Sequence, residues 1–133
     1  MDMPVASLLS VTPLYAALLG LLFIPITVRA GFYRGKAKIF IGDGGDPELL
    51  RRIRGQGNFI ETVPIALILL VVMELAGAGG NWLNALGGLL VLGRICHYIA
   101  ITELGPGFLR PVGMVGTLSV YLVGSGWLLV NML

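Results

Sequence analysis

Four polar residues with complementary chemistry lie at the start of one apolar segment of the sequence. Arg54, Asn58 and Glu61 lead directly into the apolar run 65–73, and Arg51 comes just before them. An α-helix turns by about 100° per residue, so positions 54, 58 and 61 fall within roughly 60° of one another. One helical face therefore carries guanidinium, amide and carboxylate groups at the mouth of a hydrophobic segment. Charges at that depth are costly, and they usually face a bundle interior or a wet cavity and serve a function.

The composition is that of an integral membrane protein. The chain has 133 residues, of which 56% are apolar and only 12% are charged, against about 25% charged in soluble domains. The length fits one domain, 1–133. All nine Lys and Arg residues lie between positions 29 and 54 or at positions 94 and 110. Cations at helix ends argue against nucleic-acid binding, and the single Cys96 allows neither an intrachain disulfide nor a Cys-based metal site, so no metal is expected.

Four segments are long and apolar enough to cross a membrane as helices. The second has a clear start, because Asp46 is a favourable N-cap and Pro47 suits the first turn. Glycines in the third and fourth segments allow close helix packing. We therefore expect an all-α integral membrane protein, a four-transmembrane-helix bundle. The approximate spans are 5–29, 47–76, 83–102 and 111–132.

The distribution of cations predicts the topology. They lie in or beside the connections between spans one and two and between spans three and four, so these connections should be cytoplasmic and both termini non-cytoplasmic. Successive spans alternate in direction, which brings the candidate polar residues to one membrane side. These residues are Arg54, Asn58, Glu61, Arg94, His97 and Arg110, joined by Arg29 or Arg34 from the end of the first span.

Two interpretations of these residues need no ligand. Cations such as Arg34, Lys36, Lys38 and Arg52 can be membrane anchors on the positive-inside pattern. Alternatively, an ion pair between Glu61 and Arg54 or Arg94 could do no more than fix the helix register. A ligand explains more, since neither Asn58 nor Glu61 anchors a protein to anionic lipid.

The ligand that suits these groups is a small zwitterionic peptide anion. Its carboxylates would bind arginines in bidentate fashion. Its amine would bind Glu61 and its backbone would bind Asn58. A thiol on such a ligand would become a better nucleophile beside a guanidinium, because a nearby cation lowers the pKa of a thiol.

The pattern Arg54-x-x-x-Asn58-x-x-Glu61-x-x-Pro64 resembles the second-helix signature of the MAPEG family, the membrane-associated proteins in eicosanoid and glutathione metabolism. The preceding GDGG sequence and the apolar run that follows resemble short bacterial-type members. The similarity extends over nearly the whole chain: four spans, Arg94 and His97 in the third, and Arg110 sixteen residues after Arg94.

The resemblance implies a homotrimer in the bacterial inner membrane, with glutathione as co-substrate at each subunit interface and a lipophilic second substrate arriving from the membrane lipids. By position, Arg110 would be the catalytic residue that stabilises the glutathione thiolate. The implied glutathione-binding residues are Arg29 in preference to Arg34, Arg51, Arg54, Asn58, Glu61, Arg94, His97 and Tyr98.

The sequence departs from the family pattern at two positions. Many of the enzymes carry a tyrosine at the position of Ile101, for which Tyr98 is the nearest substitute. In the prostaglandin E synthase branch, a serine follows the arginine of the fourth helix, whereas Pro111 stands here.

The main hypothesis is therefore a glutathione-dependent transferase or peroxidase that acts on lipophilic electrophiles or lipid hydroperoxides. The alternative is a non-catalytic scaffold protein that binds lipid or glutathione. A small drug/proton exchanger fits least, because it would require an acidic residue near the middle of a span and the first span has none.

Overall fold

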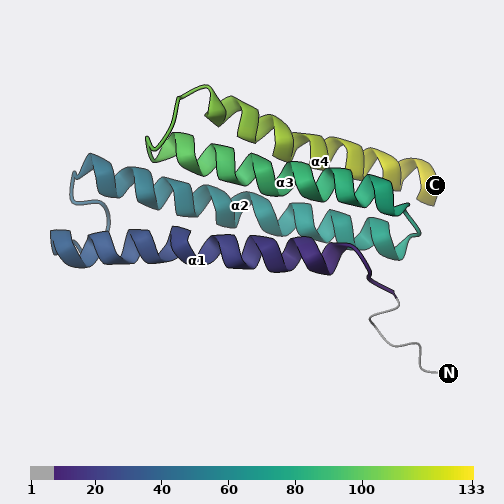
Figure 1. Ribbon diagram of the computed structural model, residues 1–133, viewed down its shortest axis with the longest axis horizontal. Coiled ribbons are helices and arrows are strands. Elements are labelled where there is room, and N and C mark those ends of the chain that lie inside the picture. Colours follow the sequence, from purple (N-terminus) through teal and green to yellow (C-terminus); the bar gives the residue numbers. More distant parts are fainter. Residues whose placement is uncertain (1–7) are drawn as a thin grey trace.

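The computed structural model describes residues 8–133, and these form four long helices that run antiparallel to their neighbours in sequence (Figure 1). The helices are α1 (Thr12–Ala37), α2 (Pro47–Leu75), α3 (Gly80–Ile101) and α4 (Leu109–Met132). Each is long and apolar enough to cross a membrane, and the described residues include no strand. The prediction of an all-α, four-span membrane bundle is confirmed, whereas the homotrimer stays a prediction.

The connections divide the bundle into two ends. The α1–α2 and α3–α4 connections lie together at one end, called here the basic end, and the α2–α3 connection lies at the other with the C-terminus (Figure 1). Lys36, Arg51 and Arg110 all belong to helix segments at the basic end. The chain thus gathers its cations as the alternation of the spans predicts.

The first helix differs from the predicted span 5–29. Positions 5–7 lie outside the described residues, and the helix continues past Arg29 to Ala37. Arg34 and Lys36 in its last turn favour this extension, because cations stabilise the negative end of the helix dipole. Lys38 then ends the helix in a left-handed conformation, with φ of 56°.

The start of α1 depends on a residue from another helix. No side chain of its own first turn caps α1. Instead, the Glu74 carboxylate accepts hydrogen bonds from the backbone N–H groups of Ser10, Val11 and Thr12 at 2.6, 2.7 and 2.7 Å. These groups lack partners within the helix. The end of α2 therefore holds the beginning of α1, a role of Glu74 that the sequence analysis did not identify.

The contact between α3 and α4 is made by backbone against backbone. A Cβ atom on Gly93 would lie 2.9 Å from the carbonyl oxygen of Gly113, and one on Gly116 would lie 3.0 Å from the carbonyl oxygen of Leu89. Only glycine permits this approach, as the glycine content of these segments indicates. The two helices that carry Arg94 and Arg110 are thus held in one close register.

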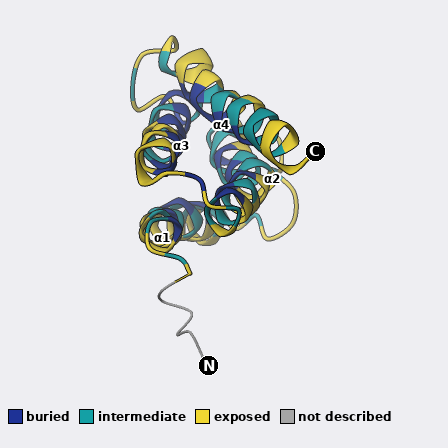
Figure 2. Ribbon diagram, turned by 90° about the vertical axis from the view of Figure 1, so that its right-hand side faces the viewer, coloured by how far each residue is buried: buried dark blue, intermediate teal, exposed yellow. Residues whose placement is uncertain are grey.

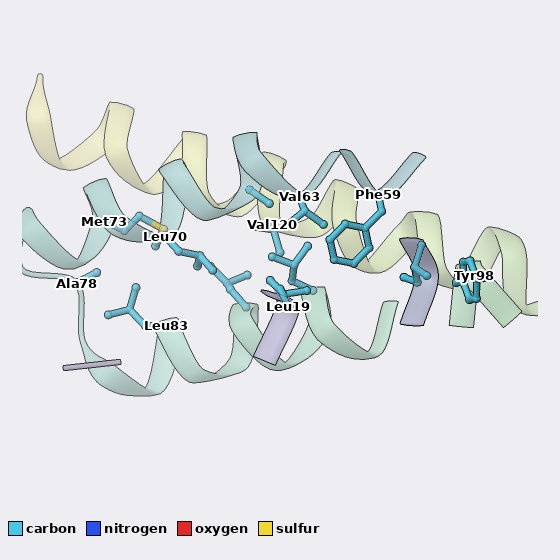
Figure 3. Packing of buried hydrophobic residues seen from close by; sticks show 13 residues of the cluster. Leu19, Phe59, Val63, Leu70, Met73, Ala78, Leu83, Tyr98 and Val120 are labelled. Atoms are coloured by element: carbon cyan, nitrogen blue, oxygen red, sulfur yellow. The ribbon is translucent and has the colours of Figure 1, made fainter. Parts of the chain in front are cut away.

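The core runs along the bundle axis and is apolar. It extends from Met73, Ala78 and Leu83 at one end to Phe59 and Tyr98 toward the basic end (Figure 3). Buried residues face the middle of the four helices, while the outer faces are largely exposed (Figure 2). Large apolar side chains cover those outer faces, as expected for surfaces in contact with lipid; examples are Leu21, Ile68 and Leu122.

Candidate functional site

Three of the predicted arginines surround one cleft at the basic end. Arg51 and Arg54 from α2 and Arg110 from α4 line a cleft of about 290 Å³. Leu50, Ala100 and Ile101 form its apolar walls. Arg54 and Arg110 are exposed. The arrangement concentrates positive charge around a space that suits the anionic groups of a small ligand.

Glu103 is an acidic residue in this cleft that the sequence analysis did not single out. Its carboxylate lies 2.9 Å from Nη2 of Arg51. The residue follows α3 in a left-handed conformation, with φ of 57°, and such a conformation is uncommon outside glycine. The turn-rich sequence after Thr102 signals a turn, but it does not indicate that the turn directs an acid toward Arg51.

Glu61 and Arg54 remain available to groups from outside the chain. Both side chains are exposed on the edge of α2. In residues 8–133, no ion pair joins Glu61 to Arg54 or to Arg94. The alternative in which such a pair only fixes the helix register is therefore not what the structure shows. An exposed carboxylate within a membrane-spanning helix needs a polar partner.

Arg94 lies inside the bundle. Its side chain is 2% exposed. Nη1 donates hydrogen bonds to Oδ1 of Asn58 and to Oγ1 of Thr62, the latter at 3.1 Å, and Nη2 donates to the carbonyl oxygen of Gly113 at 2.9 Å. Arg94 thus connects α2, α3 and α4 from the interior, rather than facing the cleft.

Arg29 and Tyr98 form a second group, on the α1 side of the basic end. The Arg29 guanidinium carbon lies 5.6 Å from the centre of the Tyr98 ring, within the range of a cation–π contact. The Tyr98 ring packs closely over Gly55, and its hydroxyl is buried without a hydrogen-bond partner in the described residues.

Two of the remaining basic residues, Arg34 and Arg52, have structural contacts. Arg34 donates hydrogen bonds to the carbonyl oxygens of Ile39 and Gly42, at 3.2 and 2.7 Å, and so holds the α1–α2 connection. Arg52 bonds to Glu48 at 2.7 Å. Arg34 is thus engaged with its own loop, and Arg29 stays the predicted candidate from α1.

His97 is buried at the α3–α4 contact. Its backbone N–H and Cβ lie so close to Gly113 that a Cβ atom added there would be 2.7 Å from each. Within one chain, the predicted site residues therefore fall into three sets. These are the exposed side of α2 with the cleft (Arg51, Arg54 and Arg110 in the cleft lining, and Glu61 exposed on α2 outside that lining), the interior (Asn58, Arg94, His97) and the α1 side (Arg29, Tyr98).

Comparison with known proteins identifies relatives of this chain. Residues 12–130 match the model of the MAPEG family. The chain is 38% identical to the inner membrane protein YecN of Escherichia coli strain K12 over 88 residues, which cover 66% of this chain and 67% of the relative. The YecN protein of E. coli O6:H1 strain CFT073 gives the same values. No solved structure matches the chain.

The family match and the four apolar helices agree on the class of protein. The match extends from the start of α1 almost to the end of α4. Together with the inner membrane relative, the helices establish a multi-pass integral protein of the inner membrane. The chain is a member of the MAPEG family.

Proposed function

We propose that this protein is a membrane-bound, glutathione-dependent transferase or peroxidase that activates the thiol of glutathione. The observation that carries the proposal is the cleft at the basic end, which Arg51, Arg54 and Arg110 line, together with the exposed Glu61 seven residues after Arg54 on the same helix. These groups complement a peptide with two carboxylates, an amine and a thiol.

Each group has a distinct role in the proposal. Arg54 and Arg51 bind the carboxylates of glutathione, with the ligand replacing Glu103 as the partner of Arg51. Glu61 binds its ammonium group, and Asn58 binds its backbone. Arg110 faces the sulfur. A guanidinium stays protonated at all useful pH values, so it stabilises a thiolate by its charge and does not act as a proton donor. Thiol ionisation releases its proton to solvent, and the thiolate is the nucleophile.

The bond changes are those of thiol chemistry. With an electrophile, the sulfur forms a bond to carbon and the leaving group departs with its electron pair. With a lipid hydroperoxide, the sulfur attacks the terminal oxygen and the O–O bond breaks to give an alcohol. A second glutathione then reduces the oxidised sulfur, yielding the disulfide and water. The second substrate reaches the site from the bilayer, and an apolar groove of about 610 Å³ along α4, lined by Leu118 and Leu122, offers one surface for it.

The proposal includes a homotrimer with shared sites. Within one chain, Arg29 contacts Tyr98 and does not line the cleft, and Glu61 is exposed on α2. In the proposal, a neighbouring subunit supplies Arg29 to the site and covers the exposed carboxylate of Glu61. Mixing Arg29→Ala subunits with Glu61→Ala subunits tests this arrangement. Partial recovery of glutathione binding in verified mixed trimers is the expected result, and no recovery would contradict shared sites.

The roles of Arg110 and Glu61 can be separated by experiment. Loss of one preorganised charge partner typically costs about 3–4 kcal/mol in the transition state, and each tenfold in rate is about 1.4 kcal/mol. Arg110→Ala should therefore reduce turnover by roughly two to three decades with little change in glutathione affinity. Glu61→Ala should weaken binding first, because the ligand ammonium loses its partner.

Two measurements in the same detergent separate the roles of Arg110 and Glu61. Calorimetry gives the glutathione affinity of each variant, and an assay with a lipophilic electrophile gives its turnover. If Arg110→Ala keeps full turnover, or loses binding as severely as Glu61→Ala, the assigned roles are wrong.

One observation favours the non-catalytic alternative, a membrane scaffold that binds glutathione or lipid. Ile101 lines the cleft at the position where many enzymes of the family carry a tyrosine. The hydroxyl of Tyr98, the candidate substitute, is buried and without a partner in the described residues. Glutathione binding without turnover in the wild-type protein would support this alternative.

A further inference from the structure

The hydrogen bonds around Arg94 determine which way the Asn58 side chain faces. A guanidinium carries five N–H donors and no acceptor. Asn58 can therefore meet Arg94 only with its carbonyl oxygen, as the structure shows. The amide nitrogen must then point to the opposite side, away from Arg94. The chemistry of the two partners settles this orientation, since a flipped amide would set two donors against each other.

The amide nitrogen of Asn58 is open to an external partner. Asn58 is half-buried. No residue in the described part of the chain accepts a hydrogen bond from its Nδ2 atom, and this atom is not among the buried side-chain atoms that lack partners. Because positions 54, 58 and 61 share one face of the helix, we infer that its two N–H donors face the same side of α2 as the exposed Arg54 and Glu61.

Thr62 and Tyr121 make the arrangement rigid. The Thr62 hydroxyl donates to the main-chain oxygen of Asn58 at 2.7 Å, which leaves its oxygen free to accept from Arg94. The Tyr121 hydroxyl donates to the main-chain oxygen of Thr62 at 2.6 Å. Donors and acceptors alternate at each of these contacts, so rotation of the Asn58 amide would break the network and leave a buried donor unpaired.

Arg94 has no carboxylate partner in residues 8–133. Its acceptors are the neutral oxygens of Asn58, Thr62 and Gly113. A buried cation held only by neutral groups is costly, and it polarises the amide that it binds. The positive charge makes the outward N–H groups of Asn58 stronger donors.

We propose that Arg94 is a positioning residue that fixes Asn58 as a hydrogen-bond donor to an acceptor group of the bound thiol peptide, a backbone carbonyl or carboxylate. Arg94 itself does not touch the ligand. This inference rests on the proposed function and adds a rule of recognition to it: at Asn58 the site accepts ligand oxygen and excludes ligand N–H.

Asn58→Asp tests this directly, because aspartate keeps the shape and the acceptor for Arg94 but removes both N–H donors. It also gives Arg94 a charged partner. Stability in detergent should therefore be unchanged or higher, while the glutathione Kd rises at least tenfold. Gln56→Glu is the matched control: it adds the same charge to α2, but Gln56 faces Thr27 of α1 and has no contact with Arg94. Its effect on the Kd should be less than threefold.

A stability cycle tests the orientation without any ligand. In the presence of Arg94, Asn58→Asp should leave the unfolding midpoint unchanged or higher. In an Arg94→Gln background, the same substitution should lower the midpoint, because the carboxylate then has no cation to face. Arg94→Lys retains a charged donor and should recover part of the glutathione affinity that Arg94→Gln loses.

Two results would overturn the inference. One is unchanged or tighter glutathione binding by Asn58→Asp, and the other is equal destabilisation by Asn58→Asp in both backgrounds. If the wild-type protein binds no glutathione, the proposed function fails and the ligand part of this inference fails with it. The stability cycle then still decides the orientation of Asn58.

Discussion

Gly113→Ala should destabilise the bundle strongly, because the new methyl group has no space. Its Cβ would lie 2.7 Å from both the backbone nitrogen and the Cβ of His97, and it would also clash with the carbonyl oxygen of Gly93. Normal contacts between such atoms are about 3.5–4.0 Å. The obstacles are mainly backbone atoms and Cβ, which cannot rotate away, so α4 must move off α3.

The magnitude follows from two losses. Overpacking of a close contact typically costs about 1–3 kcal/mol. Displacement of α4 also stretches the 2.9 Å hydrogen bond from Arg94 to the carbonyl oxygen of Gly113, and a bond to a charged group contributes about 1.5–3 kcal/mol. The sum of the two losses is about 2.5–6 kcal/mol in the free energy of unfolding.

Gly126→Ala on the same helix is the control. No atom lies within 4 Å of a Cβ at this position, so alanine should be neutral or stabilise by up to about 1 kcal/mol through its higher helix propensity. Unfolding by SDS in mixed micelles, followed by far-UV circular dichroism, measures both variants. If Gly113→Ala and Gly126→Ala unfold at the same SDS fraction, the close α3–α4 contact described here is wrong.

Three further outcomes are expected. Glu74→Gln should lower the free energy of unfolding by about 1–2 kcal/mol, because a neutral amide is a weaker cap for the start of α1; an unchanged SDS midpoint would contradict that role. The pKa of the Asp46 carboxyl lies below its ordinary value because the carboxylate accepts hydrogen bonds. The largest effect comes from the backbone N–H of Leu49, and smaller ones come from the Tyr33 hydroxyl and the Glu48 N–H. The contribution of ionised Asp46 to the free energy of unfolding should be complete above the unfolded-state pKa of about 3.9. It should be lost as the pH falls through the lower folded-state pKa, and Asp46→Asn should remove this part of the acid dependence of stability. In a Cys96→Ser background, a cysteine at Gly79 should react with an impermeant reagent outside intact cells and one at Lys36 should not; the reverse result would invert the predicted topology.

Much of the fold was predictable from sequence because the signals are local. The apolar lengths gave the four spans, and Asp46-Pro47 marked the start of α2, where Asp46 accepts from the backbone N–H groups of Glu48 and Leu49. The alternation of spans placed Arg51, Arg54 and Arg110 at one end, and the structure brings these three to one cleft. The end of α1 was less predictable, since its last turns are polar yet remain helical.

The contacts that the sequence did not reveal depend on tertiary geometry. Glu74 caps α1 across more than 60 positions of sequence, and no local pattern indicates this partner. Arg94 lies inside the bundle because α3 and α4 approach closely at Gly93 and Gly113. The glycine content of the two segments suggests such an approach, but it does not tell which glycines meet. Glu103 reaches Arg51 because of a left-handed backbone conformation at a non-glycine residue, which residue preferences disfavour.

The central claim is that the protein binds glutathione and stabilises its thiolate. Ultraviolet difference spectroscopy on the purified wild-type protein tests it most directly. Addition of glutathione at neutral pH should produce a saturable thiolate absorption, and the Arg110→Ala variant should show a much weaker signal at the same glutathione occupancy, measured by calorimetry. A wild-type protein that shows neither binding nor thiolate absorption at millimolar glutathione would contradict the account.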